Sequence, residues 1–387
     1  MTFRYLGIPS ETHLPDRLAL RMLVQTFRPE LMDRLVDKAE RRERRRRLLP
    51  AQLMMYFALA MWLFGASSYE EVLAKLTGGL PEMFQGVGDL ATAAAIARAR
   101  MRLGVEPLKA LCGHVAASAG RRSPPDDGRV FVFESVAMEA PDTPANRVAY
   151  GVAETKDQLK GRALDVWLAS LTDCRLRASA VAAITPSRES GVEGVLSEWP
   201  HDLLGAGALV VGDQELVTPA LWQAVTESGA HQIWCAAERG PARRHLPVER
   251  ELPDGSYLST LGPDGPARGS GAGTVVRVVP RTAGSGPGRP ADPGARPLAL
   301  VTSILDDSVT ADEISARHAR VAELCRSGVG QFTAQIAGPR VVLRSKSPEL
   351  VQQEIYAMLC TYHAVGHLVS PMYSADLLSD EERGPVV

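Results

Sequence analysis

Apolar residues in the first third of the chain recur every three or four positions, which is the spacing of one face of an α-helix. Leu18, Met22, Leu23 and Phe27 follow this spacing, and the pattern continues beyond them. Ser67-Ser68 precedes Glu70-Glu71, a combination that favours a capped helix start. Pro50 stands where it can open the apolar stretch that runs to residue 64. We therefore expect residues 16–120 to be helical.

The pattern changes after the linker-like segment 123–128, which is rich in Pro, Asp and Gly. Short β-rich runs then alternate with helical stretches, which predicts an α/β domain with a mixed sheet. The expected strands are 129–137, 163–172, 176–184, 208–211, 231–235 and 298–305. The expected helices are 189–199, 218–228, 310–332 and 347–369. Residues 340–344 are expected to be a short extended piece.

Residues 239–295 interrupt this alternation with a high content of Gly, Pro and Arg. The hairpin-like run from Leu252 to Tyr257 indicates a β-rich insertion. The predicted organisation is a helical amino-terminal domain (1–122), an α/β domain in two pieces (128–238 and 296–370), the insertion (239–295) and a tail (371–387).

Charge is distributed unevenly, although the whole chain has a net charge of only −2. Residues 1–125 hold 19 Lys and Arg against 12 Asp and Glu, whereas the remainder holds 24 against 33. Such a basic first part is compatible with nucleic-acid binding, but a solvated charged helix face would give the same balance. The densest basic run consists of Arg41, Arg42, Arg44, Arg45, Arg46 and Arg47. Contact of this run with DNA phosphates is our expectation.

Other classes of protein are disfavoured by what the sequence lacks. It has no uninterrupted apolar run of membrane-spanning length and no amino-terminal pattern of a signal peptide. The five cysteines are scattered without zinc-like spacing, which fits reduced thiols in a cytoplasm. No P-loop, dinucleotide-binding fingerprint or Ser-His-Asp arrangement is visible. His363 and His367 have helical spacing but no evident third ligand.

Two acidic residues occur at predicted strands of the α/β domain. Glu134 lies inside the first strand, and Asp213 follows the fourth. Phosphodiester cleavage by two metal ions requires at least three converging carboxylates, and Mg²⁺ prefers oxygen ligands. These two acids are therefore the first candidates for a catalytic site.

Several segments around these acids resemble DDE transposases of bacterial insertion sequences, in the insertion-sequence-four-like group that carries a β-rich insertion. The run from Glu134 to Asn146 is similar to the first acidic motif, with its Pro-Asp-x-Pro-x-Asn tail. The run from Leu209 to Leu216 is similar to the second motif, and further similarity covers 252–258, 338–351 and 15–78. The resemblance implies a ribonuclease H-like mixed sheet with flanking helices, a helical DNA-binding domain and catalytic positions at Glu134 and Asp213.

The chain departs from the family pattern at each acidic motif. Glu134 replaces the first Asp and places the carboxylate one methylene further out. Asp213 is retained, but Gln214-Glu215-Leu216 replaces the Arg-Gly-Phe that follows in the family. The Tyr, Arg, Glu and Lys of the third motif align without gaps with Ala319, Ala322, Arg326 and Thr333. The third acid is thus replaced by Arg326, while Glu323 lies three residues earlier.

These departures favour a degenerate triad. One hypothesis pairs Glu134 with Arg326, so that an internal ion pair replaces the metal cluster. Asp213 could retain the inherited ligand position, or it could cap the turn after its strand.

Three functions remain open. The chain could be a repurposed DNA-binding or regulatory protein, which the departures favour most. It could be an enzyme that acts on a small molecule in the former active-site cleft. It could also be an active transposase with the rearranged triad Glu134, Asp213 and Glu323. No cofactor is expected, except Mg²⁺ if transposase activity persists; a homodimer is conceivable, and no membrane partner is expected.

Overall fold

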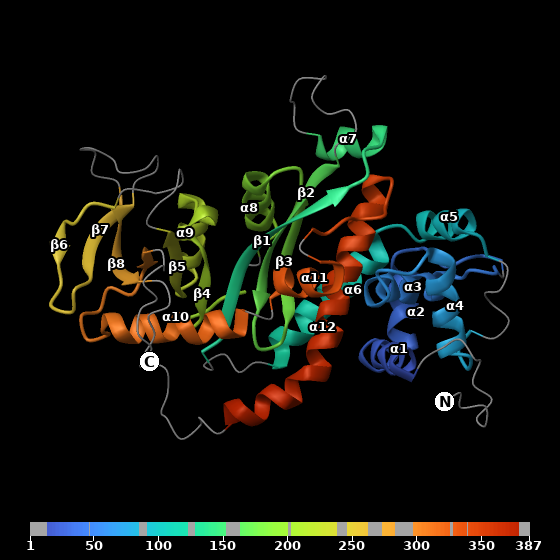
Figure 1. Ribbon diagram of the computed structural model, residues 1–387, viewed down its shortest axis with the longest axis horizontal. Coiled ribbons are helices and arrows are strands. Elements are labelled where there is room, and N and C mark those ends of the chain that lie inside the picture. The colour runs from blue at the N-terminus through green and yellow to red at the C-terminus, as the bar shows by residue number, and fades with distance from the viewer. Residues whose placement is uncertain are drawn as a thin grey trace.

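The computed structural model describes most of the chain and forms one extended sheet with helices packed around it (Figure 1). The described residues are 14–45, 47–84, 91–122, 128–151, 163–199, 203–237, 246–261, 273–282, 297–325, 328–338 and 340–378. Secondary structure follows the sequence pattern closely, and the differences concern where individual elements end.

The elements before residue 123 are all helices in the part of the chain that the structure describes. They are α1 (Leu14–Thr26), α2 (Pro29–Lys38), α3 (Ala51–Leu63), α4 (Tyr69–Gly79), α5 (Ala93–Leu103) and α6 (Glu106–Arg122). The predicted start at Ser68 is confirmed: its hydroxyl accepts from the Glu71 amide, and the Glu71 carboxylate accepts from the Ser68 amide. Pro50 is the residue before α3 rather than its first residue, which differs from the expectation by one position.

A mixed sheet forms the centre of the α/β part. It contains β1 (Val130–Ala140), β2 (Leu164–Asp173), β3 (Ala178–Thr185), β4 (Leu209–Asp213) and β5 (His231–Ala237). β1 pairs in parallel with β4, and β4 with β5, whereas β2 is antiparallel to both β1 and β3. The strand order in this part is β3-β2-β1-β4-β5. The predicted α/β class is thus confirmed, and all the predicted strands occur.

The sheet continues through strands that lie partly inside the predicted insertion. They are β6 (Arg250–Glu251), β7 (Tyr257–Leu261), β8 (Thr274–Thr282) and β9 (Pro297–Thr302), all antiparallel to their neighbours. β9 also pairs antiparallel with β5, so the insertion extends the main sheet instead of forming a separate one. Figure 1 shows these strands at the end of the molecule opposite the amino-terminal helices.

The remaining helices cover the two faces of the sheet. The short helix α7 (Pro144–Tyr150) follows β1, and α8 (Arg188–Ser197) and α9 (Pro219–Glu227) share a core with Phe131 and Phe133 of β1. A 3₁₀ turn, η1 (Gln214–Leu216), follows β4. The opposite face of β1 presents Val132 and Met138, because alternate residues of a strand face opposite sides.

The predicted helix 310–332 is wrong as a single element. The chain forms α10 (Ala311–Cys325) and a separate α11 (Val329–Ala337), with Gly328 as the residue before α11 in an extended conformation. Gly328 and Gly330 carry no side chain to favour a continuous helix, and glycine costs about 1 kcal/mol relative to Ala inside one. The break exposes the first amides of α11, and these amides find a partner on β1.

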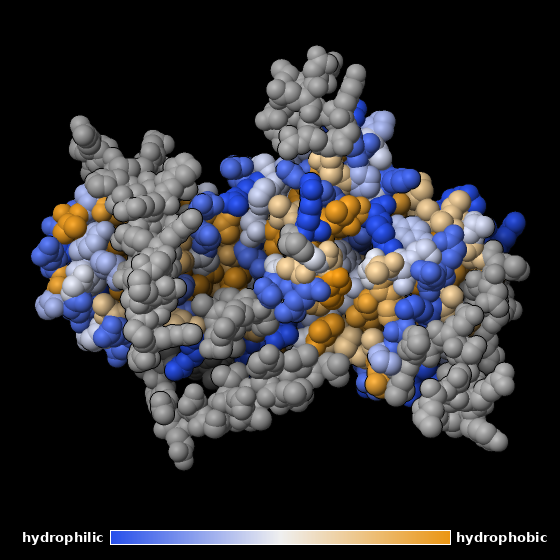
Figure 2. Space-filling view, in the orientation of Figure 1, coloured by the Kyte–Doolittle hydropathy of each residue, from blue (hydrophilic) through white to orange (hydrophobic). Residues whose placement is uncertain are grey.

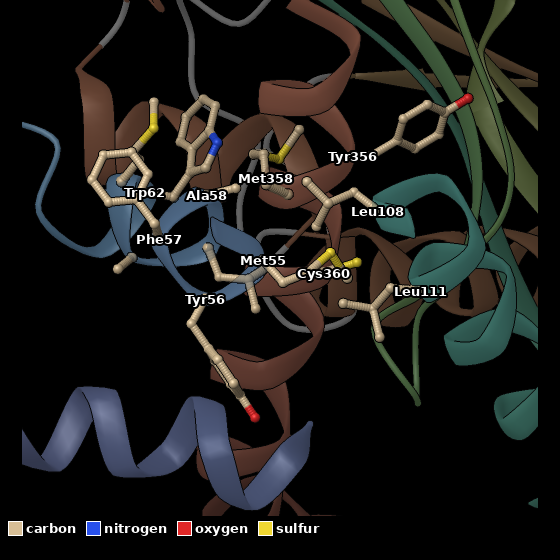
Figure 3. Close-up of a cluster of buried hydrophobic side chains, with 14 of the residues drawn as sticks. Met55, Tyr56, Phe57, Ala58, Trp62, Leu108, Leu111, Tyr356, Met358 and Cys360 are labelled. Atoms are coloured by element: carbon tan, nitrogen blue, oxygen red, sulfur yellow. The ribbon is translucent and has the colours of Figure 1, made fainter. Parts of the chain in front are cut away.

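The last helix, α12 (Pro348–Leu378), joins the carboxyl-terminal part of the chain to the amino-terminal helices. Its buried residues, including Tyr356, Met358 and Cys360, share one hydrophobic cluster with Met55 and Leu108 (Figure 3). The Trp62 indole donates to the backbone carbonyl of Glu354 at 2.7 Å. The same core therefore contains residues from both sides of position 122, and the division of the chain into domains there stays a prediction.

Figure 2 shows hydrophilic residues spread over the face in view, around smaller hydrophobic groups near its middle. Among the described residues, no helix combines the length and the apolar character that crossing a membrane requires.

Candidate active site and basic segment

Glu134 and Asp213 line the same cavity, at the point where β4 ends and β1 continues. Gly212 pairs with Phe133 in the parallel register, so β4 stops while β1 runs on to Ala140. The cavity has a volume of about 320 Å³. It is lined by Val132, Phe133, Glu134, Ser135, Arg188, Val211, Gly212, Asp213, Leu216, Cys235 and His318. The two acids that the sequence singled out are therefore brought to one site.

The Glu134 carboxylate is bound by the amino terminus of α11. Its two oxygens accept hydrogen bonds of 3.0 Å from the backbone amides of Val329 and Gly330. Amides in the first turn of a helix have no partner within the helix, and the helix dipole favours negative charge there. Glu134 thus supplies from a neighbouring strand the cap that Gly328 cannot supply.

Burial and hydrogen bonding act in opposite directions on Glu134. Burial raises the pKa of its carboxyl because it disfavours the charged form, while the amides of Gly330 and Val329 lower it. Burial prevails, and the pKa lies above its ordinary value. Among the described residues, backbone amides rather than a cation therefore oppose the effect of burial on Glu134, and they offset it only in part.

The predicted ion pair between Glu134 and Arg326 cannot be placed, because Arg326 lies outside the described residues. Glu323 belongs to α10, but its side chain also lies outside them. Thr333, which aligns with the Lys of the third motif, is buried in α11, and its hydroxyl donates to the carbonyl of Gly330 at 2.8 Å. The pairing of Glu134 with Arg326 stays a prediction, whereas the α11 amides are a partner that the sequence did not reveal.

Asp213 is exposed at the rim of the cavity. Its Oδ1 accepts a hydrogen bond of 2.9 Å from the backbone amide of Glu215, within the 3₁₀ turn that follows β4. This is the turn-capping role that the sequence left open beside a ligand role. Asp213 therefore organises the turn at the cavity mouth, and only one of its two oxygens takes part.

Arg188 and Glu215 form an ion pair beside the cavity that sequence reasoning missed. The guanidinium of Arg188 lies 2.5 Å from the Glu215 carboxylate and 5.0 Å from the centre of the Trp167 ring. Arg188 opens α8, directly after the capping residue Ser187. The capping residue Ser187 could have indicated where α8 begins. Nothing in the sequence indicated that this start lies beside Asp213.

The described residues do not form a metal-binding cluster. No group of three or more His, Cys, Asp or Glu side chains in the described part of the chain is arranged to hold a metal ion. His363 is buried, and its Nδ1 lies 3.1 Å from the carbonyl oxygen of Leu176; the side chain of His367 lies outside the described residues. Glu134 and Asp213 alone are fewer than the three carboxylates that a two-metal site needs.

The described arginines of the basic segment between α2 and α3 are all exposed, but they differ in their partners. Arg42 forms ion pairs with Asp33 and Asp37. Arg41 lies beside Gly104, at the end of α5. Arg44, Arg45 and Arg47 are exposed, and Arg46 lies outside the described residues. The predicted DNA-contacting run therefore presents at least three accessible guanidinium groups on one loop.

Two comparisons with known proteins agree with this architecture. Residues 17–112 match the family model described as the insertion element 4 transposase N-terminal region. The transposase InsG for insertion sequence element IS4 of Escherichia coli (strain K12) is 23% identical over 354 residues, which cover 89% of this chain and 75% of that protein. The amino-terminal region is thus similar to that of insertion element 4 transposases, and most of the chain is similar to one transposase of this kind.

Proposed function

We propose that this protein is a transposase relative that binds DNA through its amino-terminal helices and no longer cleaves it by two-metal catalysis. The single observation that carries the proposal is the binding of both Glu134 oxygens by the amides of α11. A carboxylate held in this way would have to leave the helix terminus before it could bridge two cations.

The fold supports the derivation of this site from a transposase active site. A mixed sheet with helices on both faces, and acids on β1 and after β4, supports the expected ribonuclease H-like arrangement. The amino-terminal family match supports DNA as the partner, since the matched region includes the basic loop. Arg44, Arg45 and Arg47 extend from that loop and offer contacts to phosphate oxygens.

The loss of cleavage is tested with the full chain and duplex DNA that carries the ends of the insertion-sequence element. We expect no nicking in Mg²⁺ or in Mn²⁺, while binding remains measurable at low salt. Nicking that depends on Asp213 and Glu323 would instead support the active enzyme with a rearranged triad.

DNA binding is tested by the double variant R44A/R45A. Each guanidinium that contacts a phosphate contributes about 0.9 to the slope of log affinity against log salt. The variant should therefore bind more weakly, and its salt slope should be smaller by up to about 2. The control R250A/R320A removes the same charge from exposed positions on β6 and α10. Equal loss in both variants would indicate a nonspecific charge effect and contradict the assignment of this loop.

A further inference from the structure

We propose that the cavity at Glu134 and Asp213 binds a small organic ammonium ion, in which a protonated amine is attached to an apolar body of about one aromatic ring. This ligand class goes beyond DNA binding and does not depend on it. The proposal rests on the walls of the cavity, on its balance of charge and on one buried hydroxyl group.

The walls of the cavity are mainly apolar. Val132, Phe133, Val211 and Leu216 contribute aliphatic and aromatic surface from β1, β4 and the turn after β4. The volume of about 320 Å³ lies at the lower end of the range for small-molecule sites, which is about 300–1,000 Å³. A compact apolar group is therefore the body that fits.

Among the described residues that line the cavity, the charges leave an excess of negative charge. Arg188 is paired with Glu215 and lies over Trp167, so its charge is already compensated. The other charged side chains in the cavity lining are the carboxylates of Glu134 and Asp213. His318 of α10 lines the cavity as well. One oxygen of Asp213 accepts from Glu215, and no other described residue donates to this carboxylate. A cation near the mouth would be attracted to this oxygen, whereas a phosphate group would be repelled.

Ser135 adds an unsatisfied polar group. Its side-chain oxygen is buried and has no hydrogen-bond partner among the described residues, although Ser135 lines the cavity. A buried polar group without a hydrogen-bond partner is unfavourable. A ligand with N–H donors would satisfy it, and an ammonium group carries such donors together with the charge that Asp213 attracts.

An ammonium ion fits this lining better than a metal ion does. Mg²⁺ requires about six oxygen ligands in a near-octahedral arrangement, and much of this cavity is aliphatic. An organic cation gains from both kinds of surface, because its body is removed from water while its charge stays at the acidic mouth. The inherited acids would thus serve a different cation.

Binding is tested on the full chain with three probes of similar shape: benzylamine, benzyl alcohol and benzoate. Calorimetry or ligand-observed NMR measures each affinity near neutral pH, where benzylamine is protonated. We expect benzylamine to bind at least tenfold more tightly than either of the other probes. Equal binding of all three, or no binding of benzylamine at millimolar concentration, would overturn the proposal.

The variant D213N locates the site. Asn keeps the side-chain oxygen that accepts from the Glu215 amide but lacks the charge, so the turn is preserved. We expect the affinity for benzylamine to fall at least threefold, and the affinity for benzyl alcohol to stay unchanged. The control D307N removes an exposed charge from the loop before α10 and should change neither affinity.

Two further outcomes would overturn the ammonium assignment. One is unchanged benzylamine binding in D213N. The other is displacement of benzylamine by low concentrations of Mg²⁺ or Mn²⁺ in the natural chain but not in D213N, because this would identify a metal site. DNA binding, measured in parallel, reports on the basic loop and separates a failure of this proposal from a failure of the proposed function.

Discussion

At the scale of single residues, the length of the Glu134 side chain determines what its carboxylate can reach. The shortened variant E134D withdraws the carboxylate by one methylene from the amides of Val329 and Gly330, which it now meets at 3.0 Å. Two part-buried amides then lose their acceptor, so we expect the free energy of unfolding to fall by about 1–3 kcal/mol. Urea denaturation measures this change.

The matched control is E139D, on the same strand. Glu139 forms its ion pair with Arg340, whose side chain is 75% exposed, and exposed pairs contribute little to stability. A loss of stability in E139D as large as in E134D would contradict the specific role of the α11 amides. On the proposed loss of cleavage, we also expect no nicking by E134D, although it restores the Asp that the resemblance implies at this position.

Asp254 is a residue whose charge links the insertion to α10. Partial burial raises the pKa of its carboxyl, but hydrogen bonds from Ser256 and the Ala311 amide, together with the Arg277 guanidinium, lower it to about 2. Because the folded-state pKa is below the unfolded value of 3.8, the ionised carboxylate stabilises the fold above that value. This contribution is lost as the pH falls from 3.8 towards 2.

We therefore expect the free energy of unfolding to decrease by about 1–2 kcal/mol over that pH window because of Asp254. Thermal unfolding of the natural chain and of D254N across the window measures it. D254N should be less stable near neutral pH, and the difference between the two proteins should shrink as the pH falls. A difference that stays constant with pH would show that the Asp254 charge does not contribute.

The residues also show how far the sequence could predict the site. It placed Glu134 and Asp213 correctly on β1 and at the end of β4, because hydrophobic runs locate strands and these acids interrupt them. It did not reveal the partner of Glu134. That partner is a set of backbone amides, which every residue except proline carries and which no side-chain pattern identifies.

At the scale of elements, Arg100 connects α5 to the segment that leads into α12. The guanidinium is fully buried and donates to Gln353 at 2.8 Å, to the Tyr69 hydroxyl at 2.8 Å and to Ser345 at 3.1 Å. The Ser345 hydroxyl in turn donates to the buried carboxylate of Glu354. This network fixes the start of α12 against α4 and α5.

We expect R100A to lower the free energy of unfolding by about 3–5 kcal/mol, because the acceptors on Gln353, Tyr69 and Ser345 lose their charged donor. Chemical denaturation measures the loss. The control R98A removes an exposed Arg two residues earlier on the same helix and should change stability by less than about 0.5 kcal/mol. Similar losses in the two variants would mean that the helix itself, and not the network, was perturbed.

Element boundaries were predicted well where local signals exist. The Ser68 capping box gave the start of α4, and Thr218 and Ser187 cap the helices that follow them. The break between α10 and α11 was not predicted as a boundary, although Gly328 and Gly330 both disfavour a helix at this point. Its position depends on a long-range contact with Glu134 of β1, and periodicity within a window cannot detect such a contact.

At the scale of the whole molecule, the amino-terminal helices and α12 share one hydrophobic core. Leu59 of α3 is fully buried in it, and the Thr361 hydroxyl of α12 contacts its carbonyl oxygen at 3.2 Å. Helices 14–122 would therefore expose apolar surface if α12 were absent. The sequence predicted that residues 16–120 and 347–369 are helical, but it could not predict that residues 302 positions apart pack together.

This shared core predicts that the amino-terminal helices do not fold independently. A fragment of residues 1–122 should show little cooperative unfolding by circular dichroism, because removal of α12 uncovers a large part of its core.

In the full chain, L59A should lower the free energy of unfolding by about 2–5 kcal/mol and shift one single transition, as monitored by both tryptophan fluorescence and circular dichroism. The exposed control L18A, on α1, should leave the transition almost unchanged. If the fragment unfolded cooperatively and bound DNA with the salt slope of the full chain, the helical region would be a separate domain, as the sequence alone suggested. If it did not, DNA binding and the fold around Glu134 would be coupled through α12, and truncated proteins would be unsuitable for testing either function.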